Sequence, residues 1–417
     1  MENIKELKEE IKLYQQLRYE QDSYSFEDIN NLNELELKNL LNTLKNEASH
    51  PQEPNDLKSI LDLSELDLSS YPVNNYLEKL KGAIIGRFVG CLLGVPVEGY
   101  SIEYMEQLAK QTGTPFPPTE YWHDIDKDEN WIQYGIDKRK NYTLNRMNAC
   151  LVDDDINFTI LNLLLLDKYG KDYTLSDIGE FWINYLPYAC TAEDRALKNL
   201  KKGVTCNLVA EDNPFIEWIG AAIRADAFAY IYPGEPLKAA KCCYNDAYLT
   251  HRRNGIYGEM FLAASISSSF ASETPLDALK IGMKFIPKES RLYKELKWAM
   301  SYENKTFTFK EARKLIDERF PGMNSVHTIN NMCAIVFVTI LAGNNYDKAI
   351  SLAVALGLDN DCTAASIGSL YGANLGINKI DAKWYQCFNN TVHTFINGLP
   401  EISIDDIINL VLKIKNT

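Results

Sequence analysis

The sequence has no surplus of basic residues. It contains 43 Lys and Arg against 57 Asp and Glu, and its formal net charge is −14. A protein that binds mainly a nucleic-acid backbone needs extra positive charge to neutralise phosphates, and no long Lys/Arg run is present. We therefore expect no nucleic-acid partner. The acidic balance fits a site that gathers carboxylates around divalent cations, but it is equally common in soluble proteins without such a site.

Long hydrophobic runs are also missing. The first ten residues alternate charged and apolar side chains and lack the apolar core of a secretory signal. The longest apolar stretches, such as Cys333–Gly343, are shorter than the roughly 20 residues needed to cross a bilayer. We therefore expect no membrane partner and a cytoplasmic location.

The nine cysteines do not form a metal-binding pattern. No CxxC pair occurs, and none of the five histidines stands at a zinc-type spacing from a cysteine. Most of the cysteines lie among apolar residues, which is typical of buried thiols in a reducing compartment. The sequence thus predicts buried, reduced thiols.

Strand signals are few and short, whereas helical periodicity recurs along most of the chain. From about Asn75 onward, apolar residues repeat at helical spacing in Leu77–Leu93, Asn157–Lys168, Ile219–Tyr230, Glu259–Phe270, Pro275–Gly282, Thr328–Leu341 and Tyr346–Ala355. No repeat with a period of 20–50 residues is present. The pattern predicts one compact all-α domain over residues 73–417.

Residues 1–72 have a different composition from the domain that follows. Apolar residues recur every three or four positions from Ile4 to Leu17, which predicts an amphipathic helix. Leu32–Leu44 and Asp56–Leu68 are also helical in pattern, with a proline-punctuated break at residues 50–55 between them. We expect a helical extension packed on the main body. The alternative is a segment that binds a partner protein or mediates oligomerisation.

A row of glycines interrupts the first helix of the main domain. Gly82, Gly86, Gly90 and Gly94 recur every four residues. Each glycine costs roughly 1 kcal/mol in a helix relative to alanine, so the row needs a physical reason. Close approach along one glycine face, by a neighbouring helix or by a ligand, is our interpretation.

Three adjacent carboxylates, Asp153–Asp155, are bordered by apolar residues on both sides. Their charges repel one another, and a divalent cation would relieve the repulsion. Hard oxygen ligands suit Mg²⁺ or Mn²⁺. The alternative is a solvated helix N-terminus, where the helix dipole favours acidic residues. These three residues alone leave both interpretations open.

Two further features carry acids at chain turns. Asp359 and Asp361 follow Gly357, and from a loop both can reach one ion, whereas helix capping needs only one of them. An EF-hand is excluded because its later ligand positions and terminal Glu are missing. Glu98 lies on a turn rich in Pro and Gly after the glycine helix, and that motif alone says little.

These three features, in this order, resemble the ADP-ribosylglycohydrolase family. The matching segments lie between about residues 78 and 380, and they are Lys81–Glu98, Asp153–Asp155, Gly220–Arg224, His251–Gly258, Val326–Asn331 and the Asp359/Asp361 loop. The resemblance implies a compact all-α fold of orthogonally packed helices. It also implies a binuclear Mg²⁺ centre, with Mn²⁺ as the alternative cation, and cleavage of a glycosidic bond to ADP-ribose.

The resemblance also implies which residues form the site. The expected metal ligands are the aspartates and one hydroxyl: Asp153, Asp154, Asp155, Asp359, Asp361 and Thr363. Glu98 and Asp155 are the expected catalytic acids. The expected substrate contacts come from the two middle segments: Gly220, Ala221, Arg224, His251, Asn254, Gly255 and Tyr257.

Two positions depart from the family pattern, which commonly has threonine at both. Asp153 precedes the aspartate pair and would add a hard ligand, while Cys362 follows the second acid of the Asp359/Asp361 pair. A thiol matches Mg²⁺ poorly. With Cys362 at this position, water or Thr363 takes the place of one metal ligand, or the ligand is missing. Either the affinity for the metal falls, or one of the two sites binds its cation differently.

The leading hypothesis is a Mg²⁺-dependent hydrolase that removes ADP-ribose from a modified protein side chain, arginine first. The expected partner is thus an ADP-ribosylated protein or a small ADP-ribosyl conjugate. One alternative is a hydrolase of small ADP-ribosyl or nucleoside conjugates. Another is a non-catalytic ADP-ribose-binding protein, including an immunity protein against an ADP-ribosylating toxin, with the extension as its docking segment.

Overall fold

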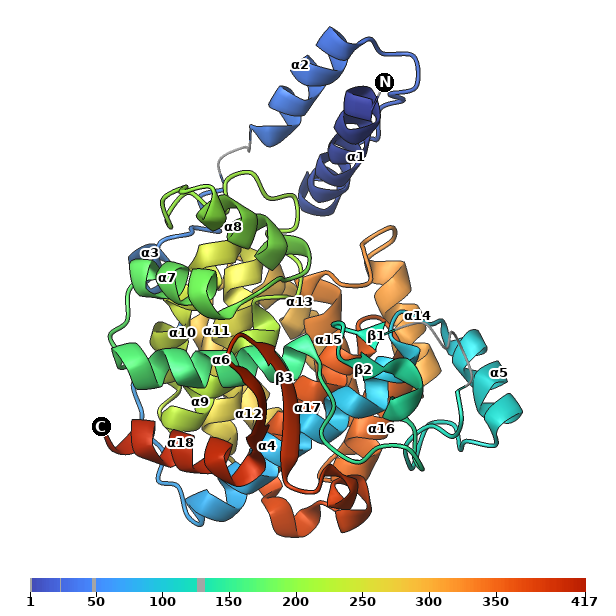
Figure 1. The fold of residues 1–417 in the computed structure, drawn as a ribbon, viewed down its shortest axis with the longest axis vertical. Helices are drawn as coiled ribbons and strands as arrows, with labels where there is room; N and C mark the ends of the chain where they lie inside the picture. Colours follow the sequence, from blue (N-terminus) through green and yellow to red (C-terminus); the bar gives the residue numbers. More distant parts are fainter. Residues whose placement is uncertain (1, 23, 47–49, 126–131) are drawn as a thin grey trace.

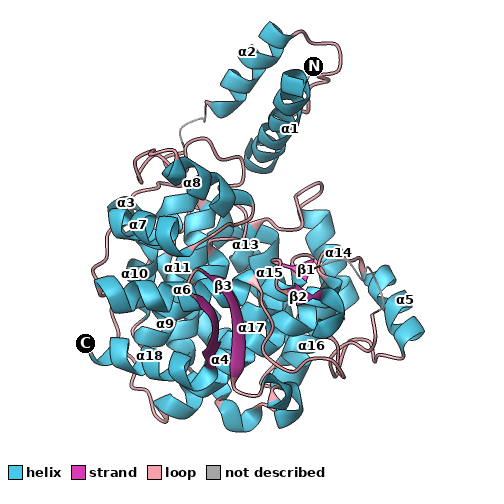
Figure 2. Ribbon diagram, in the orientation of Figure 1, coloured by secondary structure: helices cyan, strands magenta, loops and turns pink. Residues whose placement is uncertain are grey.

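The computed structural model describes residues 2–22, 24–46, 50–125 and 132–417. Among these residues, helices predominate, and the named strands form two small antiparallel sheets (Figure 2). The helices of the N-terminal region are α1 (Glu2–Asp22), α2 (Glu34–Lys45) and α3 (Leu57–Asp62). The α-helices of the main body are α4 (Tyr76–Gly94), α5 (Ile102–Thr112), α6 (Asp154–Tyr169), α7 (Leu175–Tyr185), α8 (Thr191–Lys201), α9 (Asp226–Ile231), α10 (Pro236–Thr250), α11 (Asn254–Ser269), α12 (Pro275–Gly282), α13 (Arg291–Met300), α14 (Phe309–Arg319), α15 (Thr328–Ala342), α16 (Tyr346–Leu356), α17 (Asn360–Leu375) and α18 (Ile404–Asn416). The strands are β1 (Ile132–Gln133), β2 (Asp137–Lys138), β3 (Thr391–Ile396) and β4 (Leu399–Ser403). The all-α prediction is confirmed.

Side-chain caps set the start of many helices. Thr174 accepts a hydrogen bond from the Asp177 backbone at the start of α7, and the Asp177 side chain accepts one from the Thr174 backbone. The same reciprocal pair forms between Thr308 and Glu311 at the start of α14. Each cap satisfies N–H groups that the first turn of a helix leaves without partners. These local signals mark the residues at which α7 and α14 begin.

The N-terminal helices α1 and α2 form a hairpin that projects from one end of the main body (Figure 1). Their apolar faces pack in a small cluster of Ile11, Tyr14, Leu17, Leu37 and Leu44, which Ile216 of the main body joins. The predicted amphipathic helix is confirmed. The helix expected over residues 56–68 ends earlier, at Asp62, and the backbone N–H of Leu66 instead donates to the Lys284 carbonyl.

The segment between this hairpin and α3 is anchored inside the main body. The buried carboxylate of Glu53 accepts hydrogen bonds from Arg253 Nε and from the Arg291 backbone, both at 2.7 Å. Asn55 Oδ1 accepts one from the Arg253 backbone, also at 2.7 Å. The extension is therefore joined to the core by a buried ion pair as well as by its apolar cluster.

The glycine row of α4 packs against α17. A methyl group at Gly82, Gly86 or Gly90 would come within 3.0 Å of the α17 backbone, closer than real Cβ atoms approach. Gly94, the last of the row, faces the backbone of Asp361 in the same way. Of the two interpretations of the row, the neighbouring helix is the one found. This packing fixes Asp361 against the end of α4.

By length and composition alone, Tyr76–Val97, which comprises α4 and the short 3₁₀ helix after it, could cross a bilayer. This differs from the expectation that the chain has no apolar segment of sufficient length. However, 94% of the apolar window is buried inside the protein. The segment is thus the central core helix, and Figure 1 shows it passing behind β3 and beside α17.

The prediction of a helix over Ile219–Tyr230 is wrong for the residues before Asp226. The backbone makes turns and a 3₁₀ helix at Ala222–Arg224 before α9 begins at Asp226. The reason lies in the preceding residues, because Trp218 forms an isolated bridge with His327 and Ile219 N–H donates to the Val326 carbonyl. These contacts tie the segment to the start of α15, so it cannot coil into a helix there.

Candidate metal centre

A pocket of about 160 Å³ lies where several distant segments of the chain meet. Its acidic side chains come from the turn after α4, from the starts of α6 and α8, and from the start of α17: Glu98, Asp154, Glu193, Asp359 and Asp361. Its less polar wall includes Tyr134, Cys190, Trp218, Ile219, Ile223 and Val326. The fold therefore brings together Glu98 and the two aspartate groups that the sequence analysis singled out.

The three adjacent aspartates at the start of α6 have different surroundings. Asp153 is the N-cap, and one of its oxygens accepts from the Asp155 backbone at 3.1 Å while the other accepts from Gln133 Nε2 at 3.0 Å. Asp154 is partly exposed and lines the pocket. Capping thus occupies Asp153, whereas Asp154 remains directed to the pocket. The start of α6 and the candidate metal-binding segment are therefore the same residues, Asp153–Asp155.

Asp155 is fully buried and is held by Arg87 of α4. The guanidinium donates to Asp155 Oδ1 at 3.0 Å and to its carbonyl at 2.9 Å, and it lies 2.7 Å from Asp226 Oδ2. Among the described residues, Asp155 Oδ2 has no hydrogen-bond partner. The role of Arg87 was not predicted from the sequence, although a lone arginine in an apolar helix indicates a buried counter-charge.

The candidate ligand atoms form two overlapping clusters. Carboxylate oxygens of Glu98, Asp359 and Asp361 lie within 4.8 Å of one another, and so do ligand atoms of Asp155, Asp361 and Cys362. Asp361 belongs to both, and its buried Oδ1 has no partner among the described residues. Buried polar atoms are normally hydrogen-bonded, and converging carboxylates repel. This donor set fits divalent cations, which take oxygen ligands and offset the negative charge.

Burial and mutual repulsion raise the pKa values of these acids. Burial is the main cause that raises the pKa of Asp361 to about 7, and it raises that of Asp155 to about 7 despite the opposing charge of Arg87. Burial also raises the pKa of Asp359 well above its usual range. Glu98 is exposed at the pocket mouth, so we attribute its raised pKa, about 8, mainly to the charge of Asp361. A bound cation would favour the charged forms of all four acids.

These shifts predict how the stability of the metal-free protein depends on pH. A carboxyl group whose folded-state pKa is raised stabilises the fold most below its unfolded value near 4, and this contribution is lost as pH rises through the folded value. For Asp155 and Asp361 the window runs from about pH 4 to about pH 7. In EDTA, we expect the melting temperature to fall from pH 5.5 to pH 8. The slope approaches about 1.4 kcal/mol per pH unit for each buried carboxyl group.

Added Mg²⁺ should raise the melting temperature, and the increase should grow with pH because the cation binds the deprotonated carboxylates. Differential scanning fluorimetry with EDTA or Mg²⁺ at each pH would measure both effects. Asp361→Asn removes one of the titrating groups and should flatten the profile in EDTA. A gap between the Mg²⁺ and EDTA curves that stays constant from pH 5.5 to pH 8 would contradict the assignment of these acids as ligands.

Of the predicted substrate contacts, Gly220 lines the pocket, whereas Ala221 is buried and is not one of the lining residues. Arg224 is fully buried and forms ion pairs with Asp246, at 2.5 Å, and with Glu193. Opposing carboxylates thus already occupy its guanidinium. The position of Arg224 does not support a contact with the substrate diphosphate, and we assign it a structural role.

The other predicted contacts do not line the pocket: Asn254 and Tyr257 contact the N-terminal extension or its neighbours, and His251 lies behind the pocket residue Glu193, 3.9 Å from its Oε1. Tyr257 donates its hydroxyl proton to the Pro54 carbonyl at 2.5 Å, and Asn254 donates to Glu217 at 2.8 Å. His251 is buried with Nδ1 2.6 Å from the Thr250 hydroxyl, and Gly255 packs against the Ile216 carbonyl. The residues of His251–Tyr257 are buried and do not line the pocket. The structure therefore does not place them in this pocket, and their contact with substrate stays a prediction.

The hydroxyl of Thr363 also points away from the pocket. It donates to the Asn360 carbonyl at 3.4 Å, in the first turn of α17. Cys362 lines the pocket in its place. Of the outcomes considered for Cys362, transfer of its ligand role to Thr363 is not supported by this geometry.

Several pocket residues were not found from the sequence. Glu193 is buried at the start of α8, and burial raises its pKa to about 7 although the charge of Arg224 opposes the shift. Tyr134 and Trp218 come from irregular segments, and Cys190 is the N-cap of α8. No periodicity marks such positions, because loops take their places from tertiary contacts.

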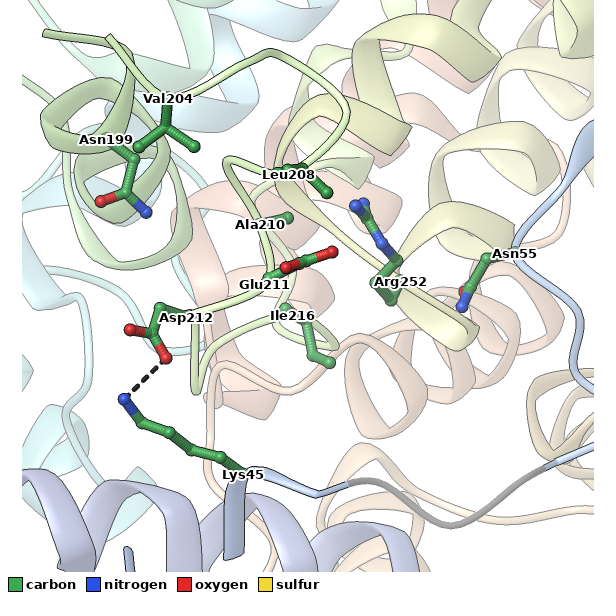
Figure 3. A pocket seen from close by; sticks show the side chains of 10 residues that line it. All are labelled: Lys45, Asn55, Asn199, Val204, Leu208, Ala210, Glu211, Asp212, Ile216 and Arg252. Carbon is green, nitrogen blue, oxygen red and sulfur yellow. Dashed lines mark ion pairs between the residues drawn. The ribbon is translucent and has the colours of Figure 1, made fainter. Parts of the chain in front are cut away.

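A larger cavity, of about 620 Å³, lies between the end of α2 and the loop that precedes Trp218. Figure 3 shows Lys45 reaching toward Asp212 at its rim, with an ion pair of 2.6 Å. Its acids, Glu211 and Asp212, are not among the described groups that could hold a metal ion. We therefore place the candidate centre in the smaller, acidic pocket.

Comparison with known proteins identifies the family and the fold. The family model described as ADP-ribosylglycohydrolase matches residues 72–412. A solved structure titled "ADP-ribosylglycohydrolase-related protein complex" has a similar fold, with a TM-score of 0.52, 18% sequence identity, and coverage of 82% of this chain and 98% of that chain. A search of curated proteins gives no match. The chain therefore belongs to the ADP-ribosylglycohydrolase family, whose members hydrolyse ADP-ribosyl conjugates.

Proposed function

We propose that this protein is a Mg²⁺-dependent hydrolase that releases ADP-ribose from a modified protein side chain, with arginine as the first candidate. The observation that supports the proposal is the convergence of Glu98, Asp154, Asp155, Asp359 and Asp361 on or beneath one pocket in a chain of this family. Mn²⁺ is the alternative cation, since it accepts the same oxygen ligands. The proposed location is the cytoplasm.

The two clusters name the residues that would hold the cations. Glu98, Asp359 and Asp361 would hold one, and Asp155, Asp361 and Cys362 the other. When bound, such cations orient hydroxyl groups and polarise a water molecule.

Glu98 is the best-placed proton carrier. Its carboxyl group is exposed at the mouth of the pocket. A carboxylate in this position can reach a proton of the attacking water or of the leaving group. Glu98 would accept a proton from the attacking water or pass one to the leaving nitrogen. We therefore assign the proton transfer to the carboxylate oxygens of Glu98.

The surrounding acids suit the charge that the reaction develops. Cleavage at the anomeric carbon of ribose passes through an oxocarbenium-like state that carries positive charge. Asp154 and Asp359 line the pocket from two sides, and their negative charge would stabilise that state. Ile219, Ile223 and Val326 supply an apolar wall that limits the access of water and strengthens these interactions.

The size of the pocket indicates which part of the substrate it encloses. Pockets that enclose a drug-sized ligand usually measure about 300–1,000 Å³, whereas this one measures about 160 Å³. It would enclose the ribose at the reacting bond, with Gly220 at its edge. The diphosphate and adenine would then lie outside the acidic pocket, where the acids do not repel the phosphates.

The direct test incubates the protein with ADP-ribosyl-arginine and ADP-ribosyl-serine substrates, in Mg²⁺ or in EDTA. We expect release of free ADP-ribose in Mg²⁺ and no release in EDTA, with the arginine linkage cleaved faster. Chromatography of the released ADP-ribose measures both rates. Release from small conjugates alone would favour the second hypothesis, a hydrolase of small ADP-ribosyl compounds. Absence of release from either linkage, together with calorimetric binding of ADP-ribose, would favour the non-catalytic alternative.

A further inference from the structure

The two ligand clusters of the candidate centre differ in chemistry. Glu98, Asp359 and Asp361 offer carboxylate oxygens alone, whereas Asp155 and Asp361 share the second cluster with the thiol of Cys362. Asp361 is common to both. The centre thus has an all-oxygen side and a mixed oxygen–sulfur side.

The mixed side has donor atoms left for an ion. Asp155 is 0% exposed and Asp361 is 3% exposed, and one oxygen of each has no hydrogen-bond partner among the described residues. The sulfur of Cys362 lies within 4.8 Å of a carboxylate oxygen of both residues, and Cys362 lines the pocket. One carboxylate oxygen of Asp155, one of Asp361 and the sulfur of Cys362 therefore lie within 4.8 Å of one another, and each of the two carboxyl groups has an oxygen without a hydrogen-bond partner of normal geometry among the described residues.

The positions of these donors are set by packing. Arg87 holds the other oxygen of Asp155 at 3.0 Å. Gly94 allows α4 to touch the Asp361 backbone, and Cys362 follows directly in the first turn of α17. The donors come from two helix starts that are braced by α4, so they do not depend on a mobile surface loop.

We infer that the two sides select different cations, which deepens the proposed function and depends on its metal centre. The side of Glu98, Asp359 and Asp361 takes Mg²⁺, because Mg²⁺ demands oxygen ligands. The side of Asp155, Asp361 and Cys362 takes a borderline transition-metal ion of the Zn²⁺ or Co²⁺ class, because a thiolate ligand favours softer ions. The thiol proton passes to solvent when the ion binds.

Two other cysteines near the centre provide controls. Cys91 lies close to Asp153 and Asp155, but both oxygens of Asp153 already accept hydrogen bonds, and Cys91 does not line the pocket. Cys190 lines the pocket, yet it belongs to none of the described ligand groups. The sulfur ligand is therefore Cys362 and neither Cys91 nor Cys190.

The test titrates the metal-free full-length protein with Co²⁺ in excess Mg²⁺ and records the sulfur-to-cobalt charge-transfer absorption in the near ultraviolet. We expect the band to appear and saturate at one Co²⁺ per chain. Cys362→Ser should remove the band and weaken Co²⁺ binding about tenfold or more in calorimetry, while Mg²⁺ binding should change less than about threefold. Cys91→Ser and Cys190→Ser should keep the band.

A band that persists in Cys362→Ser, or Co²⁺ binding without any band in the wild type, would overturn the inference. Cys362→Thr provides a second oxygen-donor variant if the serine protein does not fold. The experiments distinguish an error in the cation assignment from an error in the proposed hydrolase activity. Hydrolysis in Mg²⁺ without a cobalt–sulfur band refutes only the inference, whereas a band without release of ADP-ribose refutes only the hydrolase.

Discussion

Asp361→Asn should lower kcat/KM for ADP-ribose release in Mg²⁺ by about 10³-fold or more, a loss of about 4 kcal/mol in transition-state stabilisation. Asp361 contributes to both candidate ligand clusters, so its replacement weakens both cation positions at once. An amide of similar shape also removes the negative charge that raises the pKa of Glu98. Initial rates at several substrate concentrations, with Mg²⁺ varied, would measure the effect.

Two comparisons separate loss of the cations from loss of the fold. Asp62→Asn changes an exposed acid of α3 whose ion pair with Lys58 is also exposed, and such surface pairs contribute little, so activity should stay unchanged. In EDTA at pH 8, Asp361→Asn should melt no lower than the wild type, because the substitution relieves repulsion among buried carboxylates. Full turnover of Asp361→Asn would show that the shared ligand is assigned incorrectly.

Glu98→Gln provides a contrasting defect. Asp359 and Asp361 would still lie together beside Asp155, so cation binding measured by calorimetry should weaken less than in Asp361→Asn. Turnover should nevertheless fall, because the amide cannot exchange a proton at the pocket mouth. The pair of variants therefore distinguishes Asp361, the ligand shared by both clusters, from Glu98, the ligand that also moves the proton.

The acids of the centre could be predicted from the sequence because each group is short and unusual. Asp153–Asp155 and the Asp359/Asp361 pair place several charges within a few residues, among apolar neighbours that promise burial. Which acid faces the pocket could not be predicted. That depends on where α6 starts, because Asp153 caps the helix and Asp154 then points to the pocket. One residue of shift in the helix start would exchange their roles.

The predicted substrate-binding residues that do not line the pocket have partners far away in the sequence. Arg224 and the segment His251–Tyr257 carry polar groups that suit a phosphate or an adenine. In the structure, Arg224 pairs with Glu193 and Asp246, and the segment binds Glu53 of the extension. A sequence shows that a buried charge needs a counter-charge, but it does not show which distant residue supplies it.

The N-terminal extension shows the same limit. Its amphipathic helices were predictable from local periodicity, whereas its attachment was not. Gln21 of α1 donates to Glu217 at 2.7 Å, and Glu217 immediately precedes Trp218 in the pocket wall. The extension, which lies almost entirely outside the family match, therefore contacts the residue next to the candidate site. It does more than cover the surface of the main body.

The largest expected loss of stability comes from Gly90→Ala. Alanine is the better helix former by roughly 1 kcal/mol, but a methyl group at Gly90 would meet the backbone of Ala364 and Ala365 at less than 3.0 Å. Backbone atoms cannot rotate away as a side chain can, so the two helices would have to separate. We expect a net loss of about 3 kcal/mol or more in the free energy of unfolding, measured by urea denaturation.

Gly179→Ala on α7 is the matched control. There the methyl group would meet the sulfur and a methyl carbon at the ends of the Cys206 and Leu200 side chains, which can shift, so the gain in helix propensity should offset most of the cost. Gly94→Ala, at the C-terminal end of the row, would press on the Asp361 backbone and should weaken Mg²⁺ binding as well as stability.

If Gly90→Ala and Gly179→Ala had equal effects, the α4–α17 contact would not be the reason for the glycine row. Unequal effects on stability, with a loss of cation affinity in Gly94→Ala, would link the packing of the central helices to the geometry of the metal centre.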